Sequence, residues 1–373
     1  MSRRLCTGNR MVAEGALAAG CRFFAGYPIT PASEIYEVMM RELPGRGGLA
    51  LSAPDEISSL CYCVGASLRG LKAMTATSGP GWALMIETLQ YALMTETPVV
   101  IALVQRLGPS TGGATQGAQG DIWLTEFATS GGYTIPVFSP TTATECHDLT
   151  LQAFNWAERL RTPVVLLSDK EVAMTTEVVE SLAAPGIVER SKFSGPEVFR
   201  SYDFARPEEA PAFAAVGDAV KVTVTGSAHD KQGRLKKNAP EVIEVLRHLE
   251  QKVAAHAEEM EIVREDLDPG AHCLLVSYGI TARAARQALA TLRREGVRVS
   301  LFQPQTLFPV PRRGLARALA QVETVFVAEE NLSGQYRAVL APHLEGRRVV
   351  GINKLGAMIS PREIARAVRA AEA

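Results

Sequence analysis

The chain has 373 residues, enough for about two or three domains of roughly 150 residues each, and 47% of its residues are apolar, enough to build substantial cores. Its 40 acidic and 39 basic side chains give a formal net charge of −1, which argues against a nucleic-acid-binding surface because such surfaces need an excess of Lys and Arg. No apolar run approaches the ~18 residues of a membrane span, and the first residues contain no apolar signal segment, so we expect a cytoplasmic protein without a membrane anchor.

Residues 20–169 alternate short apolar runs with longer periodic segments, which is the pattern of a doubly wound α/β sheet. The pattern predicts strands at residues 21–25, 49–52, 74–77, 98–104, 134–138 and 163–167. It predicts helices at residues 31–40, 56–69, 82–94 and 141–160. The fourth strand is almost wholly apolar, as expected when helices cover both faces of a parallel sheet.

A less regular stretch separates this pattern from a second α/β rhythm. Proline, glycine and charged residues interrupt the chain from residue 185 to about residue 270, and residues 240–265 predict a solvated helix whose charges form an exposed face. At least four further strands are expected, at residues 273–277, 297–302, 324–328 and 349–352, with helices between them, the first at 282–294, and a last helix from 361 onward. The predicted division is a first domain over residues 1–235, a helical connector over 236–270 and a smaller domain over 271–373.

Several kinds of functional site have no motif in this sequence. None of the six cysteines is spaced as C-x-x-C, so we expect no iron–sulfur cluster or structural zinc site in this chain and interpret the cysteines as scattered buried thiols. There is no phosphate-binding P-loop, no H-E-x-x-H zinc motif and no G-x-S-x-G nucleophile elbow. Gly79 and Gly81 precede a helix, but no third glycine completes a dinucleotide fingerprint.

Polar side chains instead gather at the carboxyl ends of the predicted strands, the edge at which open α/β sheets bind ligands. Thr30 follows the first strand between two prolines and offers a hydroxyl, although an ordinary βα turn would have the same composition. Asp55 and Glu56 follow the second strand. Asp55 is also a good helix N-cap, so a purely structural role stays open there.

The loop after the fourth predicted strand carries a further signal. Arg106, Ser110 and Thr111 together suit a carboxylate, because a planar guanidinium and two hydroxyls can all donate hydrogen bonds to it. A glycine-rich segment over residues 112–121 continues the loop, and so long a loop in a compact domain is uncommon unless it is functional. The residues alone indicate an anion-binding crevice with a carboxylate nearby.

Four motifs occur in order along the chain. They are GYPITPASE at residues 26–34, DE at 55–56 with GAS at 65–67, ATSGPG at 76–81, and RLGPSTG at 106–112. Together they resemble the α subunit of the 2-oxoacid:ferredoxin oxidoreductases, of the 2-oxoglutarate or branched-chain 2-oxoacid type, and the resemblance covers nearly the whole chain. It implies a thiamine pyrimidine-binding domain over residues 1–235 and a transketolase C-terminal-like domain over residues 271–373.

The resemblance implies cofactor-binding roles for two residues. Glu56 matches the catalytic glutamate that hydrogen-bonds the pyrimidine ring of thiamine diphosphate, where a carboxylate favours the imino tautomer that takes a proton from the thiazolium ring. Pro28 belongs to the same expected cofactor-binding set. The diphosphate itself is anchored elsewhere, because neither GDI at residues 120–122 nor GDA at 217–219 completes the G-D-G…N motif.

The resemblance also implies a substrate site. Arg106 and Thr30 match residues that hold the substrate's carboxylate and its neighbouring oxygen, so both are expected to be catalytic. Ser110 and Thr111 lie beside Arg106 and are expected to shape the pocket. Several positions that flank this loop depart from the family pattern, so the identity of the 2-oxoacid stays open.

The implied activity is the oxidative decarboxylation of a 2-oxoacid with coenzyme A, which yields an acyl-CoA and carbon dioxide and sends electrons to ferredoxin or a ferredoxin-like subunit. Thiamine diphosphate would be shared with a β subunit. Mg²⁺ and [4Fe-4S] clusters are expected in partner subunits, with none bound by this chain alone, and a separate γ subunit is expected. The alternative is a non-catalytic thiamine-fold or nucleotide-binding scaffold subunit of an electron-transfer complex, against which the joint presence of Glu56 and Arg106 argues.

Overall fold

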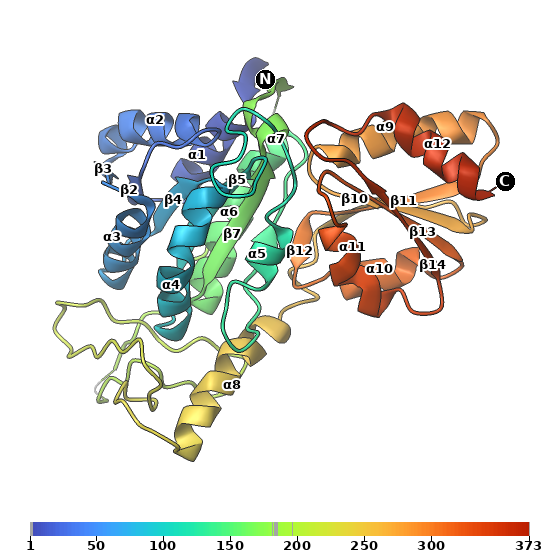
Figure 1. Cartoon of the computed structure of the whole chain (residues 1–373). Coiled ribbons are helices and arrows are strands. Elements are labelled where there is room, and N and C mark those ends of the chain that lie inside the picture. Colours follow the sequence, from blue (N-terminus) through green and yellow to red (C-terminus); the bar gives the residue numbers. More distant parts are fainter. Residues whose placement is uncertain (1–2, 181, 183–185, 196, 373) are drawn as a thin grey trace.

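A computed structural model describes residues 3–180, 182, 186–195 and 197–372 of the chain. Two α/β units lie side by side, each with a central sheet, and a long connector, residues 180–262, joins them (Figure 1). In the described residues, no helix is both long and apolar enough to cross a membrane.

The first unit contains a seven-stranded sheet in the order β12-β6-β7-β5-β4-β2-β3. Its strands are β2 (Phe23–Gly26), β3 (Leu49–Ser52), β4 (Ala73–Thr77), β5 (Val99–Gln105), β6 (Val137–Phe138), β7 (Pro163–Asp169) and β12 (Thr306–Phe308). The first six confirm the six strands predicted between residues 20 and 169, and all of their pairings are parallel. β12 was not predicted; it comes from the C-terminal part of the chain and pairs antiparallel with β6.

Helices cover both faces of this sheet (Figure 1). They are α1 (Gly8–Ala18), α2 (Ser33–Glu42), α3 (Glu56–Leu68), α4 (Gly79–Met94), α5 (Ile122–Glu126), α6 (Ala143–Leu160) and α7 (Lys170–Met174), with a 3₁₀ turn η1 (Pro44–Arg46). Alternate strand residues point to opposite faces: Phe24 and Val100 pack with α1, α2 and α6, whereas Phe23 and Ile101 pack with α3 and α4. The four predicted helices are confirmed, and α1, α5 and α7 are additions.

The connector differs from its prediction. The helix α8 (Pro240–Ala254) ends eleven residues before residue 265, and part of the remainder forms strand β9 (Val263–Asp266). The prediction that its charges form an exposed face is wrong for two side chains: His248 and Lys252 are fully buried and both contact Glu96. Because these two residues are four apart, they lie on one face of the helix, and that face is the one packed against the first unit.

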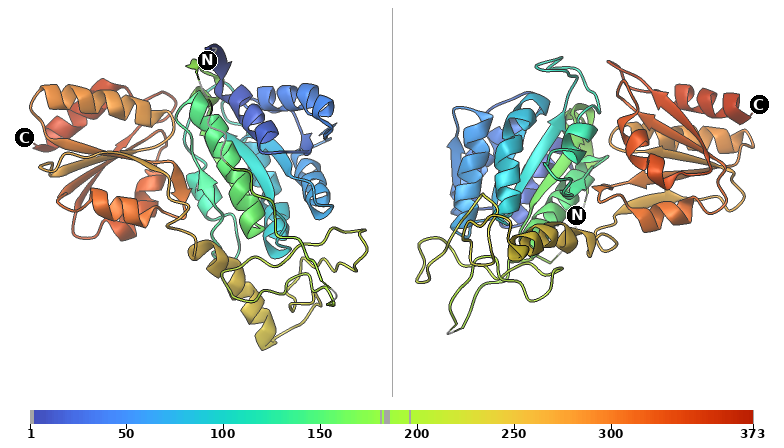
Figure 2. Two further views of the ribbon diagram at one scale, coloured as in Figure 1. Left: turned by 180° about the vertical axis from the view of Figure 1, so that it is seen from behind. Right: turned by 60° about the horizontal axis from the view of Figure 1, so that its bottom comes forward.

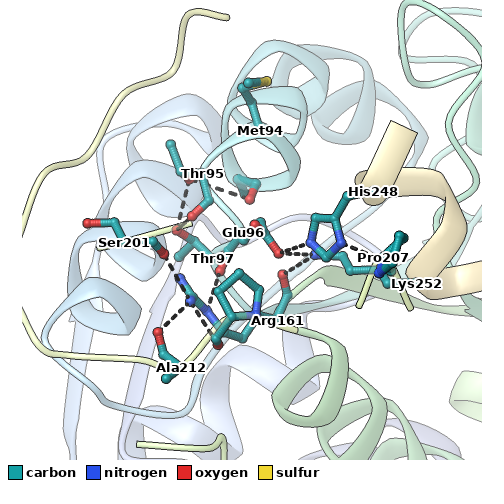
Figure 3. Close-up of polar contacts among 12 residues, drawn as sticks. Met94, Thr95, Glu96, Thr97, Arg161, Ser201, Pro207, Ala212, His248 and Lys252 are labelled. Carbon is teal, nitrogen blue, oxygen red and sulfur yellow. Dashed lines mark hydrogen bonds and ion pairs between the residues drawn. The ribbon is translucent and has the colours of Figure 1, made fainter. Parts of the chain in front are cut away.

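The buried contacts of the connector lie at the amino ends of the strands (Figure 3). Lys252 Nζ lies 2.6 Å from Glu96 Oε2, and His248 Nε2 lies 3.0 Å from the same oxygen. Arg161, which precedes β7, donates to carbonyls of the connector at Pro211 and Ala212, both at 3.1 Å. Figure 2 shows the connector beneath the first unit, which leaves the carboxyl ends of the strands free of it.

The second unit has a five-stranded sheet in the order β14-β13-β10-β11-β9, parallel except for β9. Its remaining strands are β10 (Cys273–Ser277), β11 (Val299–Pro304), β13 (Thr324–Glu329) and β14 (Arg348–Asn353). Its helices are α9 (Thr281–Arg294), α10 (Arg312–Ala318), α11 (Gln335–Leu340), the 3₁₀ turn η2 (Ala341–His343) and α12 (Pro361–Glu372). The predicted strands and helices of this part are confirmed. Outside both units, β1 (Arg4–Thr7) and β8 (Thr176–Val179) form a separate antiparallel pair.

Candidate active site

The loops after β2, β3, β4 and β5 meet at one edge of the first sheet, because these strands are neighbours and run parallel. We call this the carboxyl edge. Glu56 stands there at the first position of α3, which begins after the N-cap Asp55. Asp55 Oδ1 accepts a hydrogen bond from Ser58 N at 2.7 Å, and the hydrogen bonds from Ser58 lower the pKa of Asp55. Asp55 therefore has the structural N-cap role, and Glu56 is held by the helix that this cap starts.

The side chain of Glu56 is buried but has no hydrogen-bond partner for its carboxylate in the part of the chain that the structure describes. It lies against the start of α4. A Cβ added at Gly81 would lie 2.7 Å from Glu56 Oε1 and 2.2 Å from Thr77 Oγ1, so only glycine leaves space for both side chains. The carboxylate is thus available to a donor from outside these residues.

Arg106 is the first residue after β5, and it ties two loops of the carboxyl edge together. Its Nη1 donates to the Thr30 carbonyl at 2.7 Å and its Nη2 to the Thr111 carbonyl at 2.9 Å. Its Nε is buried and has no partner among the described residues. Thr30 and Thr111 therefore contact Arg106 through their backbone oxygens rather than through the hydroxyls that the sequence drew attention to. Pro28 is exposed in the loop that carries Thr30.

A cavity of about 410 Å³ opens beside Arg106, between the two units. The first unit contributes Arg106, Ser110 and Asp121 to its wall, and the second unit contributes Asn331, Leu332 and Leu355. Of the predicted site residues, Arg106 and Ser110 line this cavity, and Thr30 and Thr111 reach it only through their contact with Arg106. Glu56 lies at the same carboxyl edge but outside the cavity wall.

Asp121 is a candidate site residue that the sequence reasoning did not select. It closes the glycine-rich segment after Arg106, which was the available signal. A Cβ added at Gly79, the first residue of α4, would lie 3.0 Å from Asp121 Oδ1, and Asp121 Oδ2 is buried without a partner among the described residues. Burial raises the pKa of Asp121 to about 7, and the nearby charge of Arg106 partly opposes this shift. The cavity thus combines a fixed positive charge with a carboxyl group that titrates near neutral pH.

Comparison with known proteins agrees with the class that the fold and the carboxyl edge define, the thiamine-diphosphate-type α/β proteins. The family described as pyruvate flavodoxin/ferredoxin oxidoreductase, thiamine diphosphate-binding, matches residues 14–248, and pyruvate:ferredoxin oxidoreductase core domain II matches residues 271–362. The chain belongs to the 2-oxoacid:ferredoxin oxidoreductase family, in which it corresponds to the α subunit. The predicted resemblance, fold class and oxidoreductase class are confirmed.

Curated relatives cover the chain almost completely. The 2-oxoglutarate synthase subunit KorA of Methanothermobacter thermautotrophicus is 38% identical over 362 residues, which is 96% of each chain. The ketoisovalerate oxidoreductase subunit VorB of Methanothermobacter marburgensis is 33% identical over 370 residues, or 99% of this chain and 98% of the relative. The chain is therefore similar to subunits named for two different 2-oxoacids.

Two solved structures show the same architecture. The 2-oxoglutarate:ferredoxin oxidoreductase from Magnetococcus marinus, solved with 2-oxoglutarate, coenzyme A and succinyl-CoA bound, matches with a TM-score of 0.92 and 31% identity over 99% of this chain. This chain spans 65% of that protein chain. A split-gene transketolase matches with a TM-score of 0.56 at 15% identity, which supports the fold alone.

Proposed function

We propose that this chain is the catalytic α subunit of an enzyme that converts a 2-oxoacid and coenzyme A to an acyl-CoA and carbon dioxide, with electrons passing to ferredoxin or a similar carrier. The observation that carries the proposal is Glu56, whose side chain is largely buried and whose carboxylate has no hydrogen-bond partner among the described residues. Neither of its oxygens is among the fully buried atoms without a partner, so the carboxylate keeps access to the surface, from which a donor of another molecule can reach it.

The residues around Glu56 fit the pyrimidine ring of thiamine diphosphate. Such a ring offers hydrogen-bond donors to a carboxylate, and the missing Cβ of Gly81 keeps the approach to Glu56 open. When bound, this cofactor supplies an electron sink for decarboxylation. Glu56 would accept the hydrogen bond from the ring, and Pro28 would lie beside the same cofactor.

Arg106 would hold the substrate's carboxylate. Each Nη atom uses one of its two N–H groups on the loops that carry Thr30 and Thr111, so one N–H on each Nη remains for a ligand, beside the unpartnered Nε. Charge-assisted hydrogen bonds of this kind are about twice as strong as neutral ones. Ser110 and Thr111 would complete the pocket, and Thr30 would face the oxygen next to the carboxylate. Both the 2-oxoglutarate type and the branched-chain type of substrate are supported by relatives.

A β subunit would provide the diphosphate and Mg²⁺ side of the cofactor site, since the sequence lacks the anchoring G-D-G…N motif. The outer faces of α3 and α4 support a partner there. They expose large apolar side chains next to Glu56, namely Ile57 and Tyr62 on α3 and Leu84 on α4. An exposed apolar patch of this kind is typical of a protein–protein interface. The [4Fe-4S] clusters, the γ subunit and the ferredoxin-binding surface would belong to further partner chains.

Substitution of Glu56 by glutamine tests the proposal. The complex purified with its partner subunits would be assayed for dye reduction with 2-oxoglutarate and 2-oxoisovalerate in the presence of coenzyme A. Glu56→Gln removes the charge that polarises the ring but keeps the side-chain volume, so we expect kcat to fall ~10²–10⁴-fold, the range for loss of a general acid–base group. Glu37→Gln on the exposed face of α2 is the control and should retain wild-type turnover.

Wild-type turnover by Glu56→Gln would overturn the assigned role of Glu56. A wild-type complex that contains thiamine diphosphate but decarboxylates no 2-oxoacid would favour the scaffold alternative instead.

A further inference from the structure

Gln119 lies where the glycine-rich loop of the first unit meets the second unit. Its side chain is fully buried, and it stands two residues before Asp121. The strand ends of both sheets converge on it: Asp169 ends β7, Tyr278 follows β10, and Glu330 follows β13. None of the motifs in the sequence singled this residue out.

The amide of Gln119 uses all four of its hydrogen-bonding capacities. Its Nε2 donates to Asp169 Oδ2 at 3.3 Å and to the Tyr278 carbonyl at 3.1 Å. Its Oε1 accepts from Thr281 Oγ1 at 2.9 Å and from Glu330 N at 3.0 Å. Three of these four partners belong to the second unit, so the side chain of Gln119 joins the first unit to the second through hydrogen bonds.

The backbone of Gln119 is held by the same unit. Its N–H donates to the Glu330 carbonyl at 2.8 Å, and its carbonyl accepts from Asn331 Nδ2 at 3.0 Å. Asp169 Oδ2 also accepts from Ile280 N at 2.7 Å, which fixes the second unit directly to the end of β7. Gln119 therefore stands in a built junction rather than in a mobile loop.

The junction sits directly behind the cavity at the carboxyl edge. Ala118 and Gly120, the two neighbours of Gln119, line that cavity together with Arg106. The loop between Arg106 and Gln119 is closed by two backbone hydrogen bonds. Leu107 N donates to the Gln116 carbonyl at 2.9 Å, and Gly113 N donates to the Leu107 carbonyl at 2.8 Å. A shift at Gln119 would therefore be passed through the loop to Arg106.

We propose that Gln119 is a positioning residue, through which the second unit holds the 106–121 loop in the shape that binds the 2-oxoacid. The identity of the substrate rests on the proposed function. The anchoring of the loop by Gln119 rests on the geometry alone. In this proposal the second unit has two parts in substrate binding: it lines the cavity, and it fixes the loop that carries Arg106.

The first experiment measures steady-state kinetics of the complex with its partner subunits. In Gln119→Ala the four partners lose their contacts and the loop loses its anchor, so we expect KM for the 2-oxoacid to rise at least about tenfold. The chemical step uses groups outside the junction, so kcat should change by less than about threefold. A purely structural loss of folded enzyme would lower the apparent kcat and leave KM unchanged.

A matched set of threonine variants separates anchoring from general damage. Thr281→Val removes the hydroxyl that donates to Gln119, and Thr281→Ser keeps it, so KM should rise in the first and be restored in the second. Thr306→Val is the control. Thr306 is equally buried and hydrogen-bonds the connector at Met260 and Ile262, but it has no contact with Gln119. It should lower stability without raising KM.

Hydrogen exchange of the loop provides a readout that does not depend on turnover. The amides of Leu107, Gly113 and Gln116 are hydrogen-bonded within the loop and should exchange faster in Gln119→Ala, whereas the amides of β7 should not. Unchanged exchange at these three amides, or an unchanged KM, would overturn the proposal. If the wild-type complex decarboxylated no 2-oxoacid while loop exchange still rose in Gln119→Ala, the proposed function would fail and the anchoring would stand.

Discussion

Arg106 and Asp121 stand at the two ends of one loop and carry most of the charge of the candidate cavity. Each has one buried side-chain atom without a partner among the described residues, Nε in Arg106 and Oδ2 in Asp121. Each Nη atom of Arg106 donates to a backbone carbonyl, so the side chain is fixed in place before any ligand arrives. Such fixed donors are what an anion site needs, because little free energy is then lost in ordering them when the ligand binds.

The raised pKa of Asp121 leads to a pH-dependent prediction. Burial raises this pKa from its ordinary value to about 7, so the folded protein keeps a proton that the unfolded chain releases above about pH 4. Folded stability contributed by this group is therefore present at low pH and is lost as the pH rises toward 7. Asp121→Asn is neutral at every pH. It should be more stable than the wild type at pH 8, by on the order of a few kcal/mol at most, and this advantage should be clearly smaller at pH 5, which lies only about one unit above the pKa of the unfolded group.

Urea unfolding of both proteins at the two pH values measures this difference. Asp203→Asn, at a partly exposed side chain of the connector, is the control and should show no such pH dependence. An equal stability difference at pH 5 and pH 8 would contradict a raised pKa at Asp121.

At the residue scale, part of the candidate site could be predicted from the sequence. Glu56 and Arg106 could be predicted because both lie in the segments that follow strands, and the carboxyl edge of a parallel sheet is where such residues gather. Their roles remain predictions. Asp121 and Gln119 could not be predicted, because their surroundings are built by residues from distant parts of the chain. A local pattern carries no information about such contacts.

The element with the largest departure from expectation is α8. Its sequence is rich in charges, which predicts a solvated helix, yet the pair Glu96–Lys252 is fully buried. Burial alone would raise the pKa of Glu96, but Lys252 and His248 hold it far below its ordinary value. A buried charge is stable only with its partner, so the pair binds α8 to the first unit.

Lys252→Met tests this pair. The change leaves Glu96 buried without its cation, and we expect the free energy of unfolding to fall by about 3–5 kcal/mol, as for other broken buried pairs. Arg369→Met is the control, because Arg369 makes an exposed pair with Glu295 and its loss should change stability little. Urea unfolding at pH 7 compares the two variants, and equal losses would contradict a special role for the buried pair.

Among the elements, those with strong periodicity and ordinary length were predicted well. Several elements were not, among them α1, β9 and β12. α1 has a buried face made largely of small residues, with Gly15 close to the backbone of His147, so its apolar period is weak. β9 and β12 have only four and three residues, and each gains its strand structure by pairing with a distant segment. Such pairing depends on the tertiary fold rather than on local sequence.

At the scale of the whole molecule, the two units are joined by a shared sheet and by hydrogen bonds as well as by the connector. β12 lies beyond the connector in sequence, yet it completes the sheet of the first unit beside β6. Gln119 and Asp169 bond the first unit to the second at the other strand ends. The first sheet therefore reaches its full width only when the C-terminal part of the chain is in place, so we expect the wild type to unfold in one cooperative transition.

Gly279→Ala tests this coupling. Gly279 has φ of +55°, and an added Cβ would lie 2.3 Å from Asp169 Oδ2 and 2.6 Å from Gln119 Nε2. The alanine would force the turn after β10 away from β7 and open the junction between the two units. Differential scanning calorimetry should then resolve two transitions in place of one.

Gly296→Ala is the matched control for this last variant. Gly296 also has a positive φ, +84°, but nothing lies within 4 Å of an added Cβ, so only the backbone strain is shared between the two substitutions. It should lower the midpoint slightly and keep a single transition. A single transition with the same midpoint in both variants would mean that backbone strain alone accounts for the effect. Two transitions in the wild type would mean that β12 and the junction do not couple the units.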